Sequence, residues 1–499
     1  MSYKLDLSGV KRDGETSLTQ QLVDRFARAI EEGELEPGEK LPPTRTLAAE
    51  AGINHLTAAR VYRRLAELGY VTASVGRGTF VRSLVPAAGA EGDDAWQSLA
   101  LPDRAISYQS EVLSDAFRFA NDPDVISLAT GFPSPSCYPT RALAKVSAEV
   151  FEHEGDAALA YLGAEGVPLL REQLAARGRE HGYASEPDEI LVTSGAQQAI
   201  DLIARTVLDP GDVAVIESPT FVGALSALRA TGARVIGLPV DGEGLDVDSL
   251  ETVLARHEVK LVALQPACHN PTGRDLSPER RERLARLAVE RNFFVMEDGV
   301  YSDLRFEGEG GRALRELAPG HVMYVNSLSK TVGGGLRIGW IAAQGPVLDR
   351  LAMLKLESDF FTAALTQHIA ARWLASGDYE KHVQKTIGFY RERRDALMAA
   401  LERQLAGEYR AEAPNGGHHV WVTLTRPLDE RSLYSEALRH GVTFTPGGAV
   451  TVERRSQTSL RLSFSLLDPE ELDEGVRRLG RAIRALRRRA RLSRAAPVS

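Results

Sequence analysis

The feature that most constrains the fold of this chain is an alternation of short apolar runs with helical patterns between residues 190 and 329. Each run has the length of a strand, and each gap between two runs is long enough for a helix. Strands joined by helical crossovers form parallel sheets. The alternation therefore predicts a large α/β domain with a mostly parallel sheet. The predicted strands are ILVTSG at 190–195, VAVIES at 213–218, RVIGLPV at 234–240, VKLVALQP at 259–266, FFVMEDG at 293–299 and HVMYVNSLS at 321–329.

From about Leu374 onward the pattern changes to long amphipathic helices with a few strands, such as GHHVWVTL and SLRLSFS. This change predicts a smaller C-terminal α+β lobe. The chain closes with nine arginines between Arg477 and Arg494, in a segment whose apolar residues keep helical spacing. We interpret this segment as an amphipathic helix with a solvated basic face, with binding to nucleic acid as the alternative.

Residues 15–82 have the pattern of three helices followed by a hairpin. We expect Thr44 to cap the second helix and Asn54 to start the third. The segment YVTASVGRGTFV at 70–81 contains two β-prone runs around a Gly-Arg-Gly turn. Together these elements predict a winged helix-turn-helix. The apolar residues predicted to line its helices are Leu22, Phe26, Ile30, Ala58, Val61, Leu65 and Leu68.

An Ala-, Gly- and acid-rich stretch without periodicity covers residues 83–104, and we interpret it as an interdomain linker. A chain of 499 residues is too long for one ordinary core. The predicted organisation is therefore multidomain, with a winged helix-turn-helix at 15–82 and the α/β domain with its smaller lobe at 105–490.

The net charge of −8 is distributed unevenly along the chain. Between Lys40 and Arg82, seven Lys or Arg stand against two acids, a net charge of +5, so the rest of the chain carries −13. A basic module on an acidic body is expected when only one domain contacts phosphates. A helix-turn-helix inserts its second motif helix into the major groove. The candidate DNA contacts are His55, Leu56, Arg60 and Arg63 on the outward side of that helix and Arg77 at the hairpin tip.

The run from Pro37 to Val81 resembles the winged helix-turn-helix of GntR-type regulators. The matching pieces are G-x-x-LP-x-x-R at 38–45, L-A-x-x-x-G-I at 47–53 and G-R-G-T-F-V at 76–81. The resemblance implies that Arg45 and the start of the third helix contact DNA. It also shows a departure, because this sequence has His55 where the family commonly has arginine. The departure affects the expected base preference more than DNA binding itself.

A second set of residues follows the ends of the predicted strands. Lys330 lies in a Ser/Gly-rich loop after the last strand, with the hydroxyls of Ser327 and Ser329 and the guanidinium of Arg337 nearby in sequence. Such a lysine can form a Schiff base, and such a guanidinium can bind a phosphate. Gly195, Ala196 and Gln197 open a helix, where free backbone N–H groups attract an anion.

Other strands end in side chains that suit an aromatic cofactor. Phe221 can stack on a ring, and Asn270 and Tyr301 can donate to a phenolate-like oxygen. Asp298 can pair with a protonated pyridine nitrogen. Ligands bind beyond the carboxyl ends of parallel strands, so the shared location of these groups indicates one site.

From about Ile106 to Ala490 the chain resembles aminotransferases of fold type I that depend on pyridoxal 5′-phosphate (PLP). The resemblance implies that Lys330 forms the Schiff base with PLP and that Asp298 holds the pyridine nitrogen. Asn270 and Tyr301 would hold the 3′-oxygen, and Phe221 would stack on the ring. The residues implied to hold the phosphate are Gly195, Ala196, Gln197, Ser327, Arg337 and, from the partner subunit of a homodimer, Tyr161. Arg461 in SLRLSFS matches the arginine that binds an amino-acid carboxylate.

A GntR-type winged helix joined by a linker to such a domain is the arrangement of MocR regulators, which this chain resembles from end to end. The interval from Lys330 to Arg337 is one residue shorter than in plain aminotransferases, as is usual in MocR proteins. The resemblance implies a homodimeric transcriptional regulator that binds PLP, senses a small amino compound or PLP itself, and contacts an operator with two half-sites. The alternative is an active PLP-dependent aminotransferase with a DNA-binding appendage. A PLP-storage protein would leave the +5 module unexplained.

Composition excludes other classes. Cys137 and Cys268 are too few for a disulfide framework, and neither is paired with histidine at metal-ligand spacing, so we expect no metal site. No apolar run approaches the length of a membrane span, and the first residues lack the apolar stretch of a signal peptide. We therefore expect a cytoplasmic protein without a membrane partner.

Overall fold

The computed structural model divides the chain into two compact units, Met1–Ser107 and Tyr108–Ser499. The predicted linker at 83–104 lies outside the described residues, and the boundaries at 15–82 and 105–490 stay predictions. The structure describes residues 18–31, 34–35, 39–67, 70–74, 78–81, 108–120, 122–308, 310–453 and 457–495.

The N-terminal unit is the predicted winged helix-turn-helix. It contains α1 (Leu18–Glu31), α2 (Thr44–Glu50), α3 (His55–Glu67) and the antiparallel strands β1 (Val71–Ser74) and β2 (Gly78–Val81). Of the seven apolar residues predicted to line its helices, six are buried in one cluster, and Leu68 lies outside the described residues.

Of the two residues predicted at helix starts in this unit, Asn54 caps its helix and Thr44 does not. Asn54 precedes α3, and its Oδ1 accepts from the backbone N–H of Thr57 over 2.7 Å, as expected for a cap. The cap predicted at Thr44 is wrong, because Pro43 holds that position. The Thr44 hydroxyl instead forms a hydrogen bond with Nε2 of His55 over 3.0 Å.

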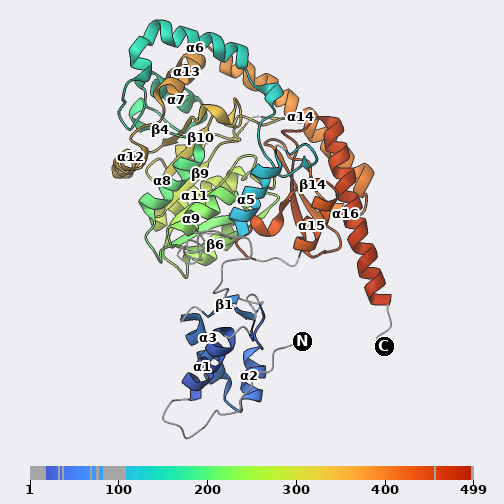
Figure 1. Ribbon diagram of the computed structural model, residues 1–499. Helices are drawn as coiled ribbons and strands as arrows, with labels where there is room; N and C mark the ends of the chain where they lie inside the picture. Colours follow the sequence, from blue (N-terminus) through green and yellow to red (C-terminus); the bar gives the residue numbers. More distant parts are fainter. Residues whose placement is uncertain are drawn as a thin grey trace. The chain divides into compact units, whose positions relative to one another are not determined.

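An eight-stranded sheet forms the centre of the larger unit (Figure 1). Its order is β4-β11-β10-β9-β8-β5-β6-β7, and the pairs from β10 through β6 are parallel. The mostly parallel sheet predicted from the alternation is confirmed. The bounds are β4 (Ile190–Thr193), β5 (Val213–Ser218), β6 (Arg234–Asp241), β7 (Gly244–Leu245), β8 (Val259–Leu264), β9 (Phe294–Asp298), β10 (Val322–Ser327) and β11 (Gly339–Ala342).

Strand β11 is antiparallel to both of its neighbours and was not among the predicted strands. It follows β10 after a loop at 328–338, which contains Lys330. A parallel crossover needs a dozen or more residues, so this short connection returns the chain in the opposite direction. The same loop thereby holds Lys330 at the carboxyl end of β10.

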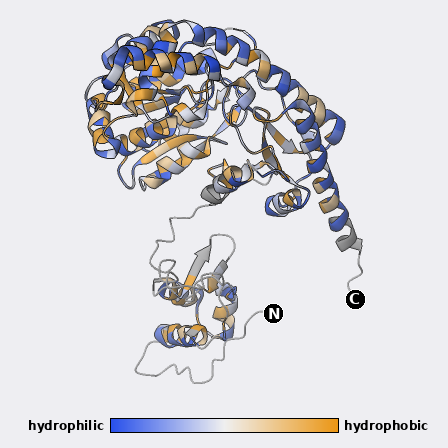
Figure 2. Cartoon of the chain, turned by 45° about the horizontal axis from the view of Figure 1, so that its top comes forward, coloured by the Kyte–Doolittle hydropathy of each residue, from blue (hydrophilic) through white to orange (hydrophobic). Residues whose placement is uncertain are grey.

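Helices cover both faces of the sheet because alternate strand residues point to opposite faces. Ile216 packs with α8 (Ala196–Val207), α9 (Val222–Ala230) and α12 (Pro346–Asp359), whereas its neighbour Val215 packs with α10 (Val247–Leu254) and α11 (Pro278–Arg291). A further apolar cluster contains residues of α6 (Thr140–Glu154), α7 (Pro168–His181) and α13 (Ala364–Ala375). Figure 2 shows hydrophobic residues along the central strands and hydrophilic residues along the outer helices.

The predicted smaller lobe has a four-stranded antiparallel sheet of order β12-β13-β16-β15. Its helices are α14 (Asp378–Leu405), α15 (Glu430–Arg439) and the arginine-rich α16 (Pro469–Ala495). The remaining elements are α5 (Tyr108–Phe119), β3 (Ile126–Ser127), β12 (Tyr409–Arg410), β13 (His419–Leu424), β14 (Val442–Thr443), β15 (Thr445–Pro446) and β16 (Ser459–Ser463). Within the part of the chain that the structure describes, no helix is both long and apolar enough to cross a bilayer.

Candidate functional site

Lys330 lies at the carboxyl end of β10, where the sequence pattern predicted a site. Its Nζ donates to the carbonyl oxygen of Gly131 over 3.0 Å and lies 5.7 Å from the ring centre of Tyr301. Desolvation and, to a smaller extent, the charge of Arg461 lower the pKa of Lys330 to about 8, although Asp298 opposes both effects. A lysine with a lowered pKa has a larger unprotonated fraction near neutral pH, which makes its amine a better nucleophile.

Asp298 ends β9 and is buried without an ion-pair partner among the described residues. Its Oδ2 accepts from Nε2 of Gln265 over 2.5 Å, and its Oδ1 accepts from the N–H of Val300 over 3.2 Å. Burial raises the pKa of Asp298 to about 6. A buried carboxylate of this kind suits a cationic partner supplied by a ligand.

Gln265 was not predicted from the sequence, and it connects two predicted residues. Its Nε2 donates to Asp298, and its Oε1 accepts from the backbone N–H of Asn270 over 2.9 Å. The signal was present in the sequence, because Gln265 is the first polar residue after the apolar strand β8. Its side chain therefore holds the ends of β8 and β9 together.

Arg461 reaches the same site from β16, in the smaller lobe. Its guanidinium donates to Oδ1 of Asn270 over 3.2 Å, to the carbonyl of Ala129 over 2.8 Å and to the hydroxyl of Thr445 over 2.9 Å. Only 8% of its surface is exposed, and burial lowers the pKa of Arg461 to about 10. Within the described ranges it has no carboxylate partner, so all of its acceptors are neutral.

The turn before α8 is built around Gly195, whose φ is +85°. This conformation favours glycine, and a Cβ there would lie 2.6 Å from Nη2 at the end of the Arg337 side chain, which would have to shift. Arg337 is exposed, and its Nη2 donates to the carbonyl of Ser194 over 2.6 Å. The expectation that the N–H of Gly195 is free is wrong, because this N–H donates to the carbonyl of Thr193 over 2.8 Å.

The N–H groups of Ala196 and Gln197 open α8 and have no acceptor among the described residues, as a first helical turn requires. The side chain of Gln197 donates to the carbonyl of Gly223, and the ring of Phe221 lies against the same glycine. The hydroxyl of Ser327 is buried and donates to the carbonyl of Ile338 over 2.8 Å, so its proton would have to turn to serve a phosphate.

Tyr161 is the predicted residue that the single chain does not bring to this site. Its side chain is 88% exposed, and its ring contacts Phe361 with 5.4 Å between ring centres. Phe360, next along the chain, is also exposed. An exposed aromatic pair of this kind suits contact with another protein surface.

Three further residues near Lys330 were not predicted. Gly131 accepts from Lys330, and the adjacent histidines His418 and His419 are buried beside the ring of Tyr301. Burial lowers the pKa of each histidine well below its usual value. Gly131 lies far from these residues in sequence, and GHHVWVTL was interpreted only as a strand. No local spacing pointed to this contact.

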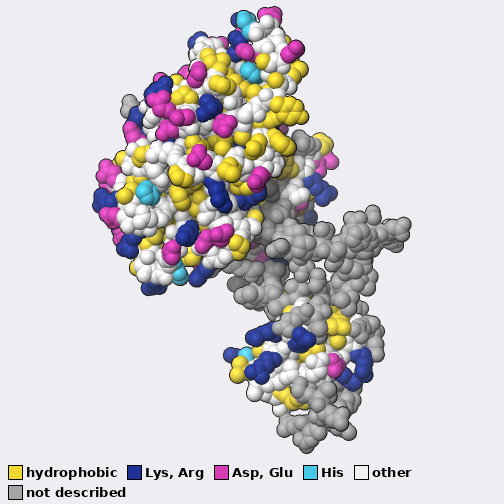
Figure 3. All heavy atoms as spheres, turned by 90° about the vertical axis from the view of Figure 1, so that its left-hand side faces the viewer, with side chains coloured by type: hydrophobic (Ala, Val, Ile, Leu, Met, Phe, Trp, Pro, Cys, Tyr) yellow, Lys and Arg dark blue, Asp and Glu magenta, His cyan; other side chains and the backbone are white. Residues whose placement is uncertain are grey.

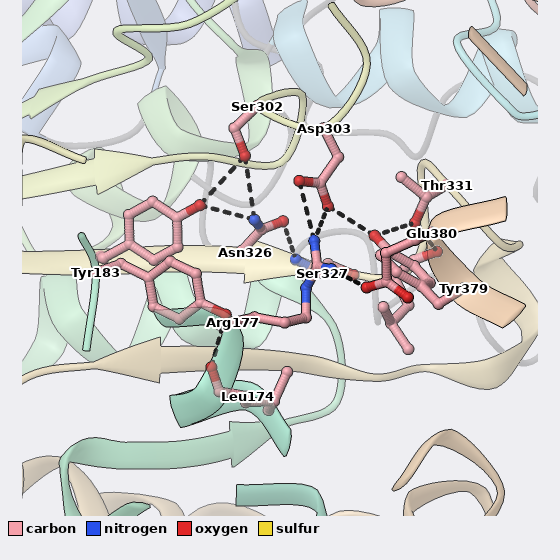
Figure 4. Close-up of polar contacts among 12 residues, drawn as sticks. Leu174, Arg177, Tyr183, Ser302, Asp303, Asn326, Ser327, Thr331, Tyr379 and Glu380 are labelled. Atoms are coloured by element: carbon pink, nitrogen blue, oxygen red, sulfur yellow. Dashed lines mark hydrogen bonds and ion pairs between the residues drawn. The ribbon is translucent and has the colours of Figure 1, made fainter. Parts of the chain in front are cut away.

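A polar network anchors the loop that carries Lys330 (Figure 4). The hydroxyl of Tyr379 bonds to Oδ2 of Asp303 over 2.7 Å and to Oγ1 of Thr331 over 3.2 Å. Arg177 donates to both oxygens of Asp303 and also pairs with Glu380. Because Asp303 follows Tyr301 by two residues and Thr331 follows Lys330 directly, the network ties the two loops of the site together.

The N-terminal unit presents predicted DNA contacts on α2 and α3. Leu56, Arg60 and Arg63 of α3 are exposed, as is Arg45 of α2, whereas His55 is bonded to Thr44. On the described surface in Figure 3, Lys and Arg side chains predominate on this unit, whereas both signs of charge are mixed on the larger one. Arg77 lies outside the described residues.

Comparison with known proteins identifies both units. Residues 18–81 match the gntR family of bacterial regulatory proteins, and residues 123–479 match the aminotransferase class I and II family. The uncharacterized HTH-type transcriptional regulator YisV of Bacillus subtilis is 31% identical over 95% of this chain and 98% of its own. The probable rhizopine catabolism regulatory protein MocR of Rhizobium meliloti is 27% identical over 95% of each chain.

A solved structure extends the comparison to the larger unit. LysN, an α-aminoadipate aminotransferase from Thermus thermophilus, is 34% identical and has a TM-score of 0.72, with 79% of this chain and 99% of that chain covered. It was solved in complex with N-(5′-phosphopyridoxyl)-L-leucine. The aminotransferase class I and II fold depends on PLP, and PLP is the cofactor of this domain. The chain belongs to the aminotransferase class I and II family in its MocR form, in which a GntR-type helix-turn-helix precedes the PLP domain of a transcriptional regulator.

Proposed function

We propose that this regulator is controlled by a small amino compound that carries a carboxylate and binds in the PLP domain. The observation that carries the proposal is Arg461, a buried guanidinium whose acceptors among the described residues are all neutral. Keeping an arginine charge out of water is costly unless an anion compensates it. A carboxylate that arrives with the effector supplies this anion, and the planar guanidinium can hold it with two parallel bonds.

The buried charges around Lys330 fit PLP as the group that completes the site. The Asp298 carboxylate would hold the protonated pyridine nitrogen, and the amine of Lys330 would hold the cofactor covalently. PLP supplies an aldehyde for amino groups and an electron-withdrawing ring. Asn270 and Tyr301 would donate to the 3′-oxygen, and Phe221 would cover the ring.

The phosphate would be held where α8 begins. We assign this role to Ala196, Gln197, Ser327 and Arg337, with Gly195 forming the turn before the helix and Tyr161 contributed by the partner subunit of a homodimer. The first turn of a helix attracts anions through its free N–H groups and its dipole. The 88% exposure of Tyr161 in the single chain supports its assignment to a partner.

The chain's own residues have separate tasks when an effector arrives. Lys330 would hold the cofactor through its amine, and when that amine is not bound, its Nζ would hold a proton near the carbonyl of Gly131. Arg461 orients the effector by its carboxylate, and it simultaneously orients the amide of Asn270. Lys330 and Arg461 belong to different lobes, so effector binding would change the contacts between the lobes. Such a change would transmit effector binding to the rest of the protein.

The N-terminal unit would bind DNA through its positively charged side chains. Arg45, Arg60, Arg63 and Arg77 would neutralise phosphates or reach base edges, and His55 and Leu56 would contact bases. A homodimer carries two winged helices and would therefore contact an operator with two half-sites.

A protein of this function works in the cytoplasm. Relatives that match over 95% of this chain are named as regulators, so we do not propose transamination as its physiological activity.

A screen of amino compounds tests the proposal. Each compound is added to the PLP-loaded protein, and the visible spectrum and the affinity for operator DNA are recorded together. We expect compounds with both an amine and a carboxylate to change both properties. If only amines without a carboxylate change both properties, the role assigned to Arg461 is wrong. If PLP alone changes the affinity for DNA, PLP itself is the effector.

A further inference from the structure

His419 lies between Tyr301 and Gly131. It begins β13, is 4% exposed, and has its Nε2 3.2 Å from the hydroxyl oxygen of Tyr301. A Cβ at Gly131 would lie 2.3 Å from Cε1 of His419, so only glycine leaves room for this ring. The imidazole therefore packs closely against the backbone of Gly131, whose carbonyl also accepts from Lys330.

The surroundings of His419 favour its neutral imidazole. Burial lowers its pKa well below the usual value, and the charges of Arg461, His418 and Lys330 act in the same direction. A neutral imidazole has one N–H donor and one acceptor, and its surroundings decide which nitrogen carries the proton.

The two nitrogens of His419 have different surroundings. Nδ1 is buried and has no hydrogen-bond partner among the described residues, whereas Nε2 faces the hydroxyl of Tyr301. A proton on Nδ1 would leave a buried donor unsatisfied, which proteins rarely tolerate, whereas an unused lone pair is less costly. The geometry therefore favours the tautomer that carries its proton on Nε2 and donates to the oxygen of Tyr301.

This direction of donation matters because the Tyr301 hydroxyl has a single proton. Its oxygen accepts from His419, so its own proton is free to point elsewhere. We propose that His419 is a positioning residue that turns the hydroxyl proton of Tyr301 toward the cofactor. The inference rests on the proposed role of Tyr301 as a donor to the 3′-oxygen of PLP. A hydroxyl that accepts one hydrogen bond also becomes a stronger donor, so His419 both orients and strengthens Tyr301.

Two substitutions of similar chemistry separate this role from packing. The amide nitrogen of glutamine can reach the position of Nε2, so His419→Gln retains a donor to Tyr301. Asparagine is shorter and reaches only the position of Nδ1, so His419→Asn removes that donor but keeps a polar side chain. The third variant, Tyr301→Phe, removes the hydroxyl on which His419 is proposed to act.

The readout is the midpoint pH of the visible spectral change of the full-length, PLP-loaded protein. We expect His419→Asn to shift this midpoint in the same direction as Tyr301→Phe but by a smaller amount. His419→Gln should stay closer to wild type. In the Tyr301→Phe background, His419→Asn should add no further shift, because the hydroxyl that it orients is gone.

Other results contradict the inference in different ways. An unchanged midpoint in His419→Asn beside a shifted midpoint in Tyr301→Phe would overturn the role of His419 and leave the proposed cofactor site intact. A full additional shift in the Tyr301→Phe background would show that His419 acts without Tyr301. No shift in Tyr301→Phe itself would overturn the proposed role of Tyr301, and the inference with it.

A direct measurement does not depend on how the asparagine variant folds. Nitrogen-15 labelling of the histidines distinguishes the two neutral tautomers by NMR, and the His419 signals can be assigned with His419→Gln. We expect a neutral ring with its proton on Nε2 in the PLP-loaded protein. A proton on Nδ1, or on both nitrogens, would refute the inference.

Discussion

The guanidinium of Arg461 donates to Oδ1 of Asn270 over 3.2 Å, although 191 positions separate the two residues. This bond uses the oxygen of the asparagine amide and leaves its NH₂ group free to donate to a ligand. The residue proposed to bind the effector thus orients a residue proposed to bind the cofactor, so the two functions share one hydrogen bond.

Replacement of this arginine tests the effector site. Arg461→Ala should weaken a carboxylate-bearing effector by roughly ten- to a hundredfold, because a charge-assisted pair is removed, while PLP stays bound. Arg461→Lys should restore only part of the affinity, since an ammonium lacks the planar fork. Titration followed by visible absorbance and by DNA binding measures both, and an unchanged midpoint in Arg461→Ala would exclude a carboxylate at this position.

Lys330 should carry the cofactor. The wild-type protein is expected to be yellow, and borohydride reduction should fix PLP on the peptide that contains Lys330, as read by mass spectrometry. Lys330→Ala should remain folded, lose the covalent adduct and still bind PLP weakly through the remaining groups. An adduct on another lysine would show that the sequence pattern around Lys330 was misread.

DNA binding should depend on the exposed arginines of the N-terminal unit. Arg45→Ala and Arg60→Ala should each weaken operator binding, and each should lower the slope of log affinity against log salt by about 0.9 for every phosphate that is no longer neutralised. The visible spectrum of bound PLP serves as the control and should not change. If both variants keep the wild-type slope, these arginines do not bind phosphates.

The raised pKa of Asp298 predicts how stability depends on pH. The carboxyl group titrates at its ordinary value of 3.8 when unfolded and at about 6 when buried without a cationic partner, so the folded state binds the proton more tightly. Its stabilising contribution is complete below about pH 4 and is lost as the pH rises through 6. Relative to Asp298→Asn, the PLP-free wild type should lose up to about 3 kcal/mol over this range. Thermal unfolding at several pH values checks this, and parallel curves for the two proteins would contradict it.

Much of this protein could be predicted from local patterns. The alternation of strands and helices indicated the parallel sheet, and the residues after each strand indicated the site, because all parallel strands present their carboxyl ends at one edge. Asp298, Asn270 and Lys330 could be singled out in this way. The winged helix was equally predictable, since apolar spacing within its helices decides which side is buried.

The tertiary structure decided which distant residues meet. Gly131, Gln265 and His419 carried no recognisable spacing, yet they contact Lys330, Asp298 and Tyr301. It also showed that β11 runs antiparallel and that the N–H of Gly195 is already used. The physical reason is the same in each case: periodicity reports which face of an element is buried, whereas contacts between side chains far apart in sequence depend on how complete elements pack.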